Sequence, residues 1–580
     1  MNITIKLSGT AGDGIQSIGD ILTDGSALSG LHVFNFRSYG AEIRARGNSD
    51  ATVRISTESI HSLEREIDVL LAIQSKAAVD WADSMKKGGL VIYDTAPKRP
   101  IATEESITAH VRPDVRLLGV PITPIAQEIT GSARGKNVAA LGAAVSVLKL
   151  PKTKYRKALS NFWARKGEAF VRANLKVFDR GFAYAEEHYA HIRKRALTTD
   201  NKAMKVYSGN QALSQAMVDA GCSVFAGYPI TPASAILEHA AKEIPKRGGR
   251  VIQTEDEIAA IGVVLGASFA GARAMTATAG PGLSLMVEQL GLSYMTEVPC
   301  VIVCVQRGGP STGLPTKTEQ SDLNLAIFGG HGDTGRIVIA PTNVKECYST
   351  MVKAFEYAQR YQMPVILLSD FFLAYRRESI QTNFEKPRVK NTLVKPRTSE
   401  LKPYTRFKVT ENGISPMSVP GMENGYYTTT GLEHDEHGTP AYTAEVHETQ
   451  SAKRLRKLKT AEKEISDVTI LGSSKAEIGI ITWGSTTGAV TEAMHLAKKE
   501  GIPVKIFKTN VIWPLPRKEL IKFEKSVKKI IIPEMNQQGQ YANLLHFLDH
   551  RKIIRANFIT GIPVTPHCIL DHIKKVNDVL

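Results

Sequence analysis

Cysteine is scarce in this chain, which has only five in 580 residues. Such sparse use is typical of a reducing compartment, so we expect a cytoplasmic protein. Only Cys300 and Cys304 lie close together, and both fall within an apolar segment that predicts a strand. An iron–sulfur cluster usually needs four thiolates from a clustered run, so we interpret these two as buried core cysteines. Any cluster would then have to belong to another chain.

Long apolar runs are also missing, because no stretch approaches the roughly 20 residues that a helix needs to cross a bilayer. The N-terminal sequence MNITIKLSG lacks the basic start, the apolar stretch and the cleavage site of a signal peptide. We therefore expect no membrane-spanning segment and no secretory leader.

Aromatic residues are few, at 7%, and no RNA- or DNA-binding motif is present. We therefore do not assign the net charge of +16 to nucleic acid, since a nucleic-acid binder would gather its Lys and Arg in one patch. Here these residues are scattered, with local runs at 453–459 and 525–529. We interpret both runs as solvated helix faces or as contacts to an acidic partner, and the overall charge could steer anionic ligands.

A chain of this length is too long for one hydrophobic core, so we expect several domains. Short apolar segments alternate with helical patterns in residues 1–192, 206–378 and 471–580, which predicts α/β domains with doubly wound sheets. A polar linker at 193–205 separates the first two domains. Residues 379–470 are polar and aperiodic before a final helix, and a loop this long is usually functional or wraps a neighbouring subunit.

One acidic residue, Glu257, has surroundings suited to catalysis. It lies in TEDEIAA, where a strand ends and an apolar helix begins. Acidic residues are favoured at helix N-termini by the macrodipole, and that explanation is sufficient for Glu255 and Asp256. Glu257 is flanked by Ile258 and two alanines, so we expect it to point inward. A carboxyl group in an apolar pocket can hold a proton near neutral pH.

Two further segments supply polar groups beside this helix. The loop YPITP, residues 228–232, follows a predicted strand and is stiffened by its prolines, so it could be a plain rigid turn capped by Thr231. Arg307 ends the apolar strand CVIVCVQ and opens the glycine-rich GGPSTG. It could reach solvent, or its poorly hydrated guanidinium could bind a carboxylate. Between them, the turn ATAGPG at 277–282 has glycines that let a ligand approach the backbone.

Three segments, taken in order, resemble the alpha subunit of the 2-oxoacid:ferredoxin oxidoreductases. They are YPITP, QTEDEIAAIGVVLGASFAGARAMTATAGPG and EVPCVIVCVQRGGPSTGLPTKTEQSDL. The members of this family are thiamine diphosphate enzymes that oxidise 2-oxoacids to acyl-coenzyme A. The resemblance covers nearly the whole chain, with a gamma-type domain at 1–192, a pyrimidine-binding thiamine domain at 206–378 and a transketolase C-terminal-like domain at 471–580. The chain departs from the pattern at Ala279, where a serine is commoner.

The resemblance implies roles for particular residues. Glu257 would hydrogen-bond N1′ of the thiamine aminopyrimidine, and Thr231 and Arg307 would orient the 2-oxoacid carboxylate. The cofactor would be lined by loop and turn residues: Tyr228, Pro229, Ile230, Thr278 and Gly280.

The sequence GDG at 12–14 resembles the opening of the thiamine diphosphate motif, in which Asp and a later Asn hold a metal ion on the diphosphate. That motif needs an asparagine pair about one βα unit later, and the corresponding stretch, YGAEIRARG, has none. The turn instead resembles the glycine-rich loop of the family's gamma domain. Gly12 and Gly14 could hold a phosphate of coenzyme A at a helix N-terminus, or could simply form a tight turn.

The resemblance therefore implies an enzyme active only in a complex. A beta subunit would complete the thiamine diphosphate site and supply a magnesium ion and an iron–sulfur cluster, and ferredoxin would accept the electrons. We expect a dimer of alpha–beta heterodimers.

The motif RGGPSTGLPT and the fused arrangement look most like the 2-oxoglutarate branch, while pyruvate and branched 2-oxoacids stay open as substrates. A non-catalytic scaffold subunit is the alternative, but it would be expected to lose the side chains of Glu257 and Arg307.

Overall fold

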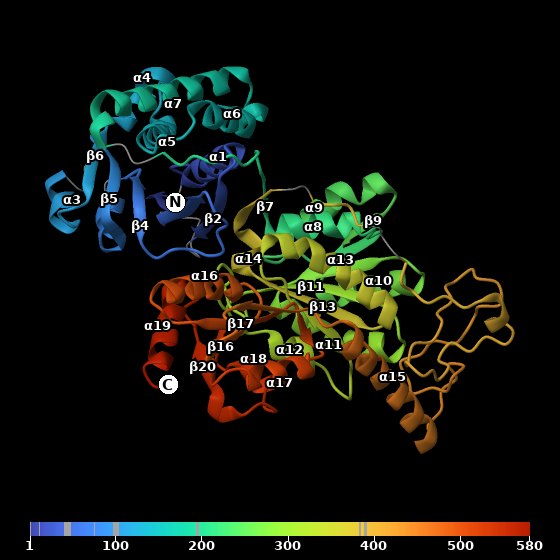
Figure 1. The fold of residues 1–580 in the computed structure, drawn as a ribbon. Helices are drawn as coiled ribbons and strands as arrows, with labels where there is room; N and C mark the ends of the chain where they lie inside the picture. The colour runs from blue at the N-terminus through green and yellow to red at the C-terminus, as the bar shows by residue number, and fades with distance from the viewer. Residues whose placement is uncertain are drawn as a thin grey trace. The chain divides into compact units, whose positions relative to one another are not determined.

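The computed structural model (Figure 1) describes residues 2–10, 12–39, 48–74, 76–96, 104–192, 196–381, 384–387 and 391–580. Two compact units form: Met1–Ser208 with Tyr375–Asn383, and Gly209–Ala374 with Phe384–Leu580. No helix in the described part of the chain is both long and apolar enough to cross a membrane. The stretch YGAEIRARG discussed above lies almost entirely outside the described residues.

The first unit is built on an eight-stranded mixed sheet. In spatial order its strands are β6 (Arg116–Val120), β5 (Met85–Asp94), β4 (Ile67–Ala72), β1 (Asn2–Thr10), β3 (Asn48–Ser56), β2 (His32–Tyr39), β14 (Arg377–Ile380) and β7 (Lys205–Ser208). The strands from β6 to β1 run parallel, and each pair from β1 to β7 is antiparallel. Two strands therefore join this sheet from beyond residue 192, because β14 lies between β2 and β7.

Helices cover both faces of this sheet, as expected of an α/β fold. The first face packs against a core shared by α1 (Ile15–Leu28), α5 (Lys136–Val147), α6 (Lys152–Trp163) and α7 (Glu168–Tyr189), and the second against α2 (Lys76–Asp80) and α3 (Glu104–His110). A short helix, α4 (Ile122–Thr130), precedes α5. Glycines let α5 and α7 meet closely: a Cβ built at Gly142 would lie 2.2 Å from the Phe178 carbonyl oxygen.

The second unit contains two sheets. The larger has the order β18 (Val511–Trp513), β12 (Ile337–Ile339), β13 (Pro364–Asp370), β11 (Cys300–Gln306), β10 (Ala274–Thr278), β8 (Val224–Gly227) and β9 (Arg250–Gln253), all parallel except β18. The smaller has the order β15 (Val468–Gly472), β17 (Val504–Thr509), β16 (Ile478–Thr482), β19 (Lys529–Glu534) and β20 (Ile553–Asn557), with β15 antiparallel. Since β18 pairs with β12, the C-terminal chain extends the larger sheet.

The helices of the second unit connect and flank these strands. They are α8 (Gly209–Asp219), α9 (Ser234–Glu243), α10 (Glu257–Phe269), α11 (Gly280–Met295), α12 (Leu323–Phe328), α13 (Val344–Tyr361), α14 (Phe371–Tyr375), α15 (Ala444–Glu464), α16 (Thr486–Lys499), α17 (Arg517–Lys525), α18 (Gln540–Leu544) and α19 (Pro566–Asn577). Together with the two sheets, these helices confirm the predicted α/β fold class.

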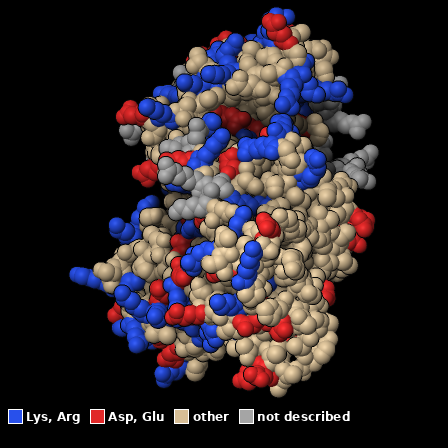
Figure 2. Space-filling view, turned by 90° about the vertical axis from the view of Figure 1, so that its right-hand side faces the viewer, with Lys and Arg blue, Asp and Glu red and all other residues tan. Residues whose placement is uncertain are grey.

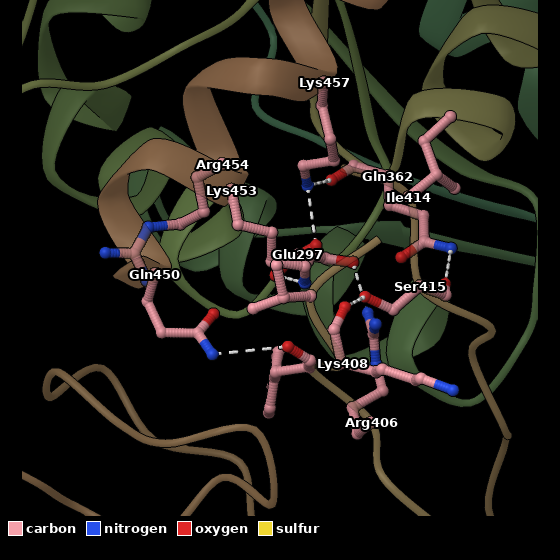
Figure 3. Close-up of polar contacts among 12 residues, drawn as sticks. Glu297, Gln362, Arg406, Lys408, Ile414, Ser415, Gln450, Lys453, Arg454 and Lys457 are labelled. Carbon is pink, nitrogen blue, oxygen red and sulfur yellow. Dashed lines mark hydrogen bonds and ion pairs between the residues drawn. The ribbon is translucent and has the colours of Figure 1, made fainter. Parts of the chain in front are cut away.

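The interpretation of the basic run at 453–459 as a solvated helix face is wrong for three of its five basic residues. In α15 the side chains of Lys453, Arg454 and Lys457 are buried. Figure 3 shows Lys453 and Lys457 converging on the carboxylate of Glu297, which Lys457 Nζ approaches to 2.9 Å. Sequence patterning missed this because the carboxylate comes from a residue more than 150 positions earlier.

A guanidinium completes this buried cluster. Arg406 is fully buried and donates from Nη2 to the Glu297 carbonyl oxygen at 2.8 Å, while Lys457 Nζ donates to the Gln362 carbonyl oxygen at 3.0 Å. Burial lowers the pKa of Lys453 to about 7 and that of Lys457 to about 8, although Glu297 opposes both shifts. The cluster thus fastens α15 and the long segment before it to the C-terminal end of α11.

Elsewhere the charge is dispersed, as the sequence predicts. Figure 2 shows Lys and Arg side chains mixed with Asp and Glu over the upper and left parts of the face it draws, and few of them at the lower right. In the run at 525–529, Lys525 and Lys528 are exposed.

Candidate active site

The parallel strands β8, β9, β10 and β11 are neighbours in the larger sheet, so their carboxyl ends lie along one edge. In α/β sheets, ligands bind beyond this edge. Four segments leave the strands here: the loop 228–232, the start of α10, the turn before α11 and the segment that begins at Arg307. The three motifs singled out in the sequence therefore end at the same edge.

Glu257 is the first residue of α10, and its side chain is buried, with 6% of the residue exposed. The helix starts here because Asp256 caps it, its carboxylate accepting from the Ala259 N–H at 2.8 Å. Capping by Asp256 leaves Glu257 free to turn inward, where the Thr278 hydroxyl donates to its Oε1 at 3.4 Å. The inward orientation predicted for Glu257 is confirmed.

Gly282 keeps space free around this carboxylate. A Cβ built at Gly282 would lie 2.0 Å from Thr278 Oγ1 and 2.4 Å from Glu257 Oε1, closer than side-chain atoms can approach. The turn that opens α11 thus needs a glycine at position 282 for a steric reason. Thr278, which is fully buried, precedes this turn, and Gly280 is the first residue of α11.

Arg307 is buried, with 8% exposed, and its Nη1 donates to the Thr231 carbonyl oxygen at 2.6 Å. Its Nε is buried and has no hydrogen-bond partner among the described residues. Burial lowers the pKa of this guanidinium, and the nearby carboxylate of Asp322 opposes that shift. Arg307 therefore keeps a donor for a ligand while it fixes the loop 228–232.

The loop itself presents its side chains outward. Tyr228 is 42% exposed, Pro229 and Thr231 are exposed, and Ile230 is half-buried. Thr231 is thus exposed, while its carbonyl oxygen accepts from Arg307.

Asp322 is a residue of this edge that the sequence reasoning missed. It precedes α12, and in a sequence it resembles an ordinary N-cap residue, so no local signal marks it. In the structure its carboxylate lies against the same turn as Glu257, since a Cβ built at Gly280 would lie 2.6 Å from each of its oxygens. Burial first, and then the charge of Glu319, raise the pKa of Asp322 to about 6, while Arg307 opposes the shift.

Gly12 and Gly14 belong to the first unit, where they form the turn between β1 and α1. Both have positive φ, at 96° and 70°, which favours glycine. Between them, the Asp13 carboxylate accepts from the Thr10 backbone N–H at 2.9 Å and pairs with Lys136 at 2.9 Å. Asp13 is thus committed to holding the turn.

The two neighbouring cysteines lie in the core. Cys300 and Cys304 are fully buried in β11, and burial raises the pKa of Cys300 to about 12. Across the described ranges, no group of three or more His, Cys, Asp or Glu side chains is arranged to hold a metal ion.

Three family models match the chain in succession. Residues 4–184 match "Pyruvate ferredoxin/flavodoxin oxidoreductase", residues 215–453 match "Pyruvate flavodoxin/ferredoxin oxidoreductase, thiamine diP-bdg", and residues 476–562 match "Pyruvate:ferredoxin oxidoreductase core domain II". The second of these contains Glu257, Thr278 and Arg307.

Similar whole proteins are known. The 2-oxoacid:ferredoxin oxidoreductase 2, subunit alpha, of Aeropyrum pernix is 30% identical over 94% of this chain and 93% of its own. The 2-oxoglutarate oxidoreductase subunit KorA of Mycobacterium tuberculosis is 33% identical over 94% of this chain and 87% of its own. Among solved structures, a 2-oxoglutarate:ferredoxin oxidoreductase from Magnetococcus marinus, with 2-oxoglutarate, coenzyme A and succinyl-CoA bound, is 37% identical. It covers 99% of each chain with a TM-score of 0.92.

Proposed function

Because this chain belongs to the 2-oxoacid:ferredoxin oxidoreductases and corresponds to their alpha subunit, we propose that it catalyses thiamine-diphosphate-dependent oxidative decarboxylation of a 2-oxoacid to acyl-coenzyme A and carbon dioxide, with ferredoxin as electron acceptor. The observation that carries the proposal is the buried carboxylate of Glu257, kept clear by Gly282 at the strand edge where Arg307 offers an unpaired donor.

The residues fit the pyrimidine half of the cofactor. Thiamine diphosphate supplies the carbon nucleophile that adds to the 2-oxo group and the electron sink for the broken carbon–carbon bond. Glu257 would hold N1′ of the aminopyrimidine through a hydrogen bond, and the bound cofactor would then supply the activated thiazolium carbon. Its burial beside the glycine turn supports this role, because the carboxylate lies away from bulk water at the strand edge where a ligand would bind.

Arg307 and Thr231 orient the substrate. The guanidinium is held at Nη1 by the Thr231 carbonyl and keeps its Nε for the 2-oxoacid carboxylate, a planar group that suits its fork geometry. The exposed Thr231 hydroxyl donates to the same carboxylate. Tyr228, Pro229 and Ile230 line the approach from the loop.

We assign 2-oxoglutarate as the substrate. Support comes from the relatives named for 2-oxoglutarate, including the methanogen subunit from Methanocaldococcus jannaschii that is 41% identical over 57% of this chain, and from the Magnetococcus marinus structure. Pyruvate and branched 2-oxoacids are the substrates to compare with it.

The rest of the active complex comes from other chains. A beta subunit completes the diphosphate site and carries magnesium and an iron–sulfur cluster, and the pair doubles across a two-fold axis. The state of Asp13 supports this division, because its carboxylate is already paired with Lys136. Gly12 and Gly14 hold a phosphate of coenzyme A at the start of α1, where backbone N–H groups favour anions.

The test is to co-express the chain with the gene of its beta subunit and to measure methyl viologen reduction with coenzyme A and a panel of 2-oxoacids. We expect 2-oxoglutarate to give the highest kcat/KM, and Glu257→Ala to abolish turnover in a complex that still assembles. Near-wild-type turnover by the assembled Glu257→Ala complex would refute the assignment and favour a scaffold role.

A further inference from the structure

Asp322 does not perform the local task that its position suggests. It precedes α12 as the N-cap residue, where an aspartate normally accepts from the first turn of its own helix, yet its side chain makes no such bond. The carboxylate is directed instead at the turn that opens α11, beside Gly280. The backbone of Asp322 is held separately, because its N–H donates to Gln306 Oε1 at 3.1 Å.

Two buried atoms at this edge lack partners. Asp322 Oδ2 is buried and accepts no hydrogen bond from any described residue. Arg307 Nε is also buried and donates to none of them. An unpaired buried polar atom is unfavourable, so it needs an explanation, and a bound ligand is one that fits this strand edge. The two side chains influence each other electrostatically, but they form no ion pair within the described structure. An unpaired donor and an unpaired acceptor that influence each other thus lie at the same edge of the sheet.

Ionisable side chains from several segments lie near Asp322. Arg307 and Cys304 belong to β11 and its end, and Glu319 belongs to the segment before α12. Glu257 lies against Gly282 of the same glycine turn. Arg307 is the one cation in this set, and it favours the ionised form of Asp322. Burial and Glu319 favour the protonated form and prevail, since they raise the pKa of Asp322 to about 6.

We propose that Asp322 faces Arg307 across the substrate site and takes up one proton when the carboxylate of the 2-oxoacid binds between them. The proposal rests on the proposed function, because it names a further binding residue of that site. Arg307 donates to one carboxylate oxygen of the substrate, and the protonated Oδ2 of Asp322 donates to the other. The proton comes from solvent, so that one negative charge and one proton enter together.

This arrangement makes substrate affinity depend on pH. An ionised Asp322 would repel the incoming carboxylate, so the protonated enzyme is the form that binds. Above pH 6 the protonated fraction falls about tenfold for each pH unit, and KM should rise by the same factor between pH 7 and pH 8. In Asp322→Asn the amide is always neutral and can still donate, so KM should change less than about twofold over that range.

The experiment measures kcat and KM for 2-oxoglutarate from pH 5.5 to 8 in the complete complex with its beta subunit. Wild type should show the rise in KM, and Asp322→Asn should remove it. Glu319→Gln should shift the rise in KM to lower pH, because it removes a charge that raises the pKa of Asp322. Glu255→Gln, which neutralises an exposed carboxylate at the same strand edge, should keep the wild-type profile.

The outcomes separate this inference from the proposed function. A wild-type complex that oxidises no 2-oxoacid would overturn the proposed function. An active complex in which Asp322→Asn keeps the wild-type pH dependence of KM, or loses only kcat, would overturn the role of Asp322. If Asp322→Asn fails to assemble, Glu319→Gln decides, since an unshifted profile contradicts the proposal.

Discussion

The guanidinium of Arg307 donates to the backbone carbonyl of Thr231 at 2.6 Å, which joins the end of β11 to the loop after β8 across 76 residues of sequence. One side chain therefore positions the loop and, in the proposed site, also binds the substrate. Changes at Arg307 should affect loop geometry and substrate binding together.

We expect Arg307→Lys to raise the KM for 2-oxoacid by about 10- to 100-fold, since a lysine cannot hold Thr231 and offer a second planar donor at once. Steady-state kinetics of the complete complex would measure this change. The exposed Arg250, at the start of β9, provides the matched Arg→Lys control. An unchanged KM in Arg307→Lys would contradict the assigned contact.

Gly282→Ala should abolish most activity, because the new Cβ would collide with Thr278 Oγ1 and Glu257 Oε1 and displace the carboxylate. Gly266→Ala is the matched control: Gly266 lies in α10 with open space around its Cβ position, and alanine favours a helix by up to about 1 kcal/mol. Turnover and thermal unfolding of both variants would be compared. Full activity in Gly282→Ala would show that the carboxylate does not need that space.

Glu297→Gln should destabilise the protein by about 3–5 kcal/mol, because two lysines and an arginine would remain buried without a compensating charge. Glu477→Gln removes a carboxylate from the exposed pair with Lys528 and should change stability by less than about 1 kcal/mol. Urea unfolding of the two variants gives the comparison. Equally small changes in stability for both variants would mean that the Glu297 carboxylate does not compensate the buried positive charges.

The same cluster should make stability depend on pH through Lys453. Its pKa in the folded state is about 7, below the value of 10.5 in the unfolded chain, so the unfolded chain binds more protons between these values. The contribution of Lys453 to folding therefore increases as pH rises from 7 to 10.5, and it is lost as pH falls through 7. Measured at pH 7 and pH 9, the stability of wild type relative to Lys453→Met should shift toward wild type at the higher pH. A constant difference would show that Lys453 does not titrate in this range.

Local patterns were sufficient to predict much of the second unit. The strands β8, β10 and β11 are recognisable from their apolar sequences. Glu257 is recognisable because its neighbours, Ile258 and two alanines, are apolar and predict a buried position. Such features depend on neighbours in sequence, so they can be identified without a structure.

Features that depend on distant parts of the chain could not be predicted in this way. Asp322 resembles a helix cap, and only the structure shows that its carboxylate lies against Gly280 instead. Lys453 and Lys457 resemble a solvated run because the buried partner Glu297 is remote in sequence. The pairing of β14 with β2 likewise joins residues more than 340 positions apart.

That strand pairing has a consequence for how the gene can be divided. A polypeptide ending at Ser208 would keep β2 and β7 but lose β14, the strand that lies between them. The edge of β2 would then present unpaired N–H and C=O groups, a template for self-association. Evolution or engineering that separates the N-terminal unit as an independent subunit must therefore supply a replacement strand or protect that edge.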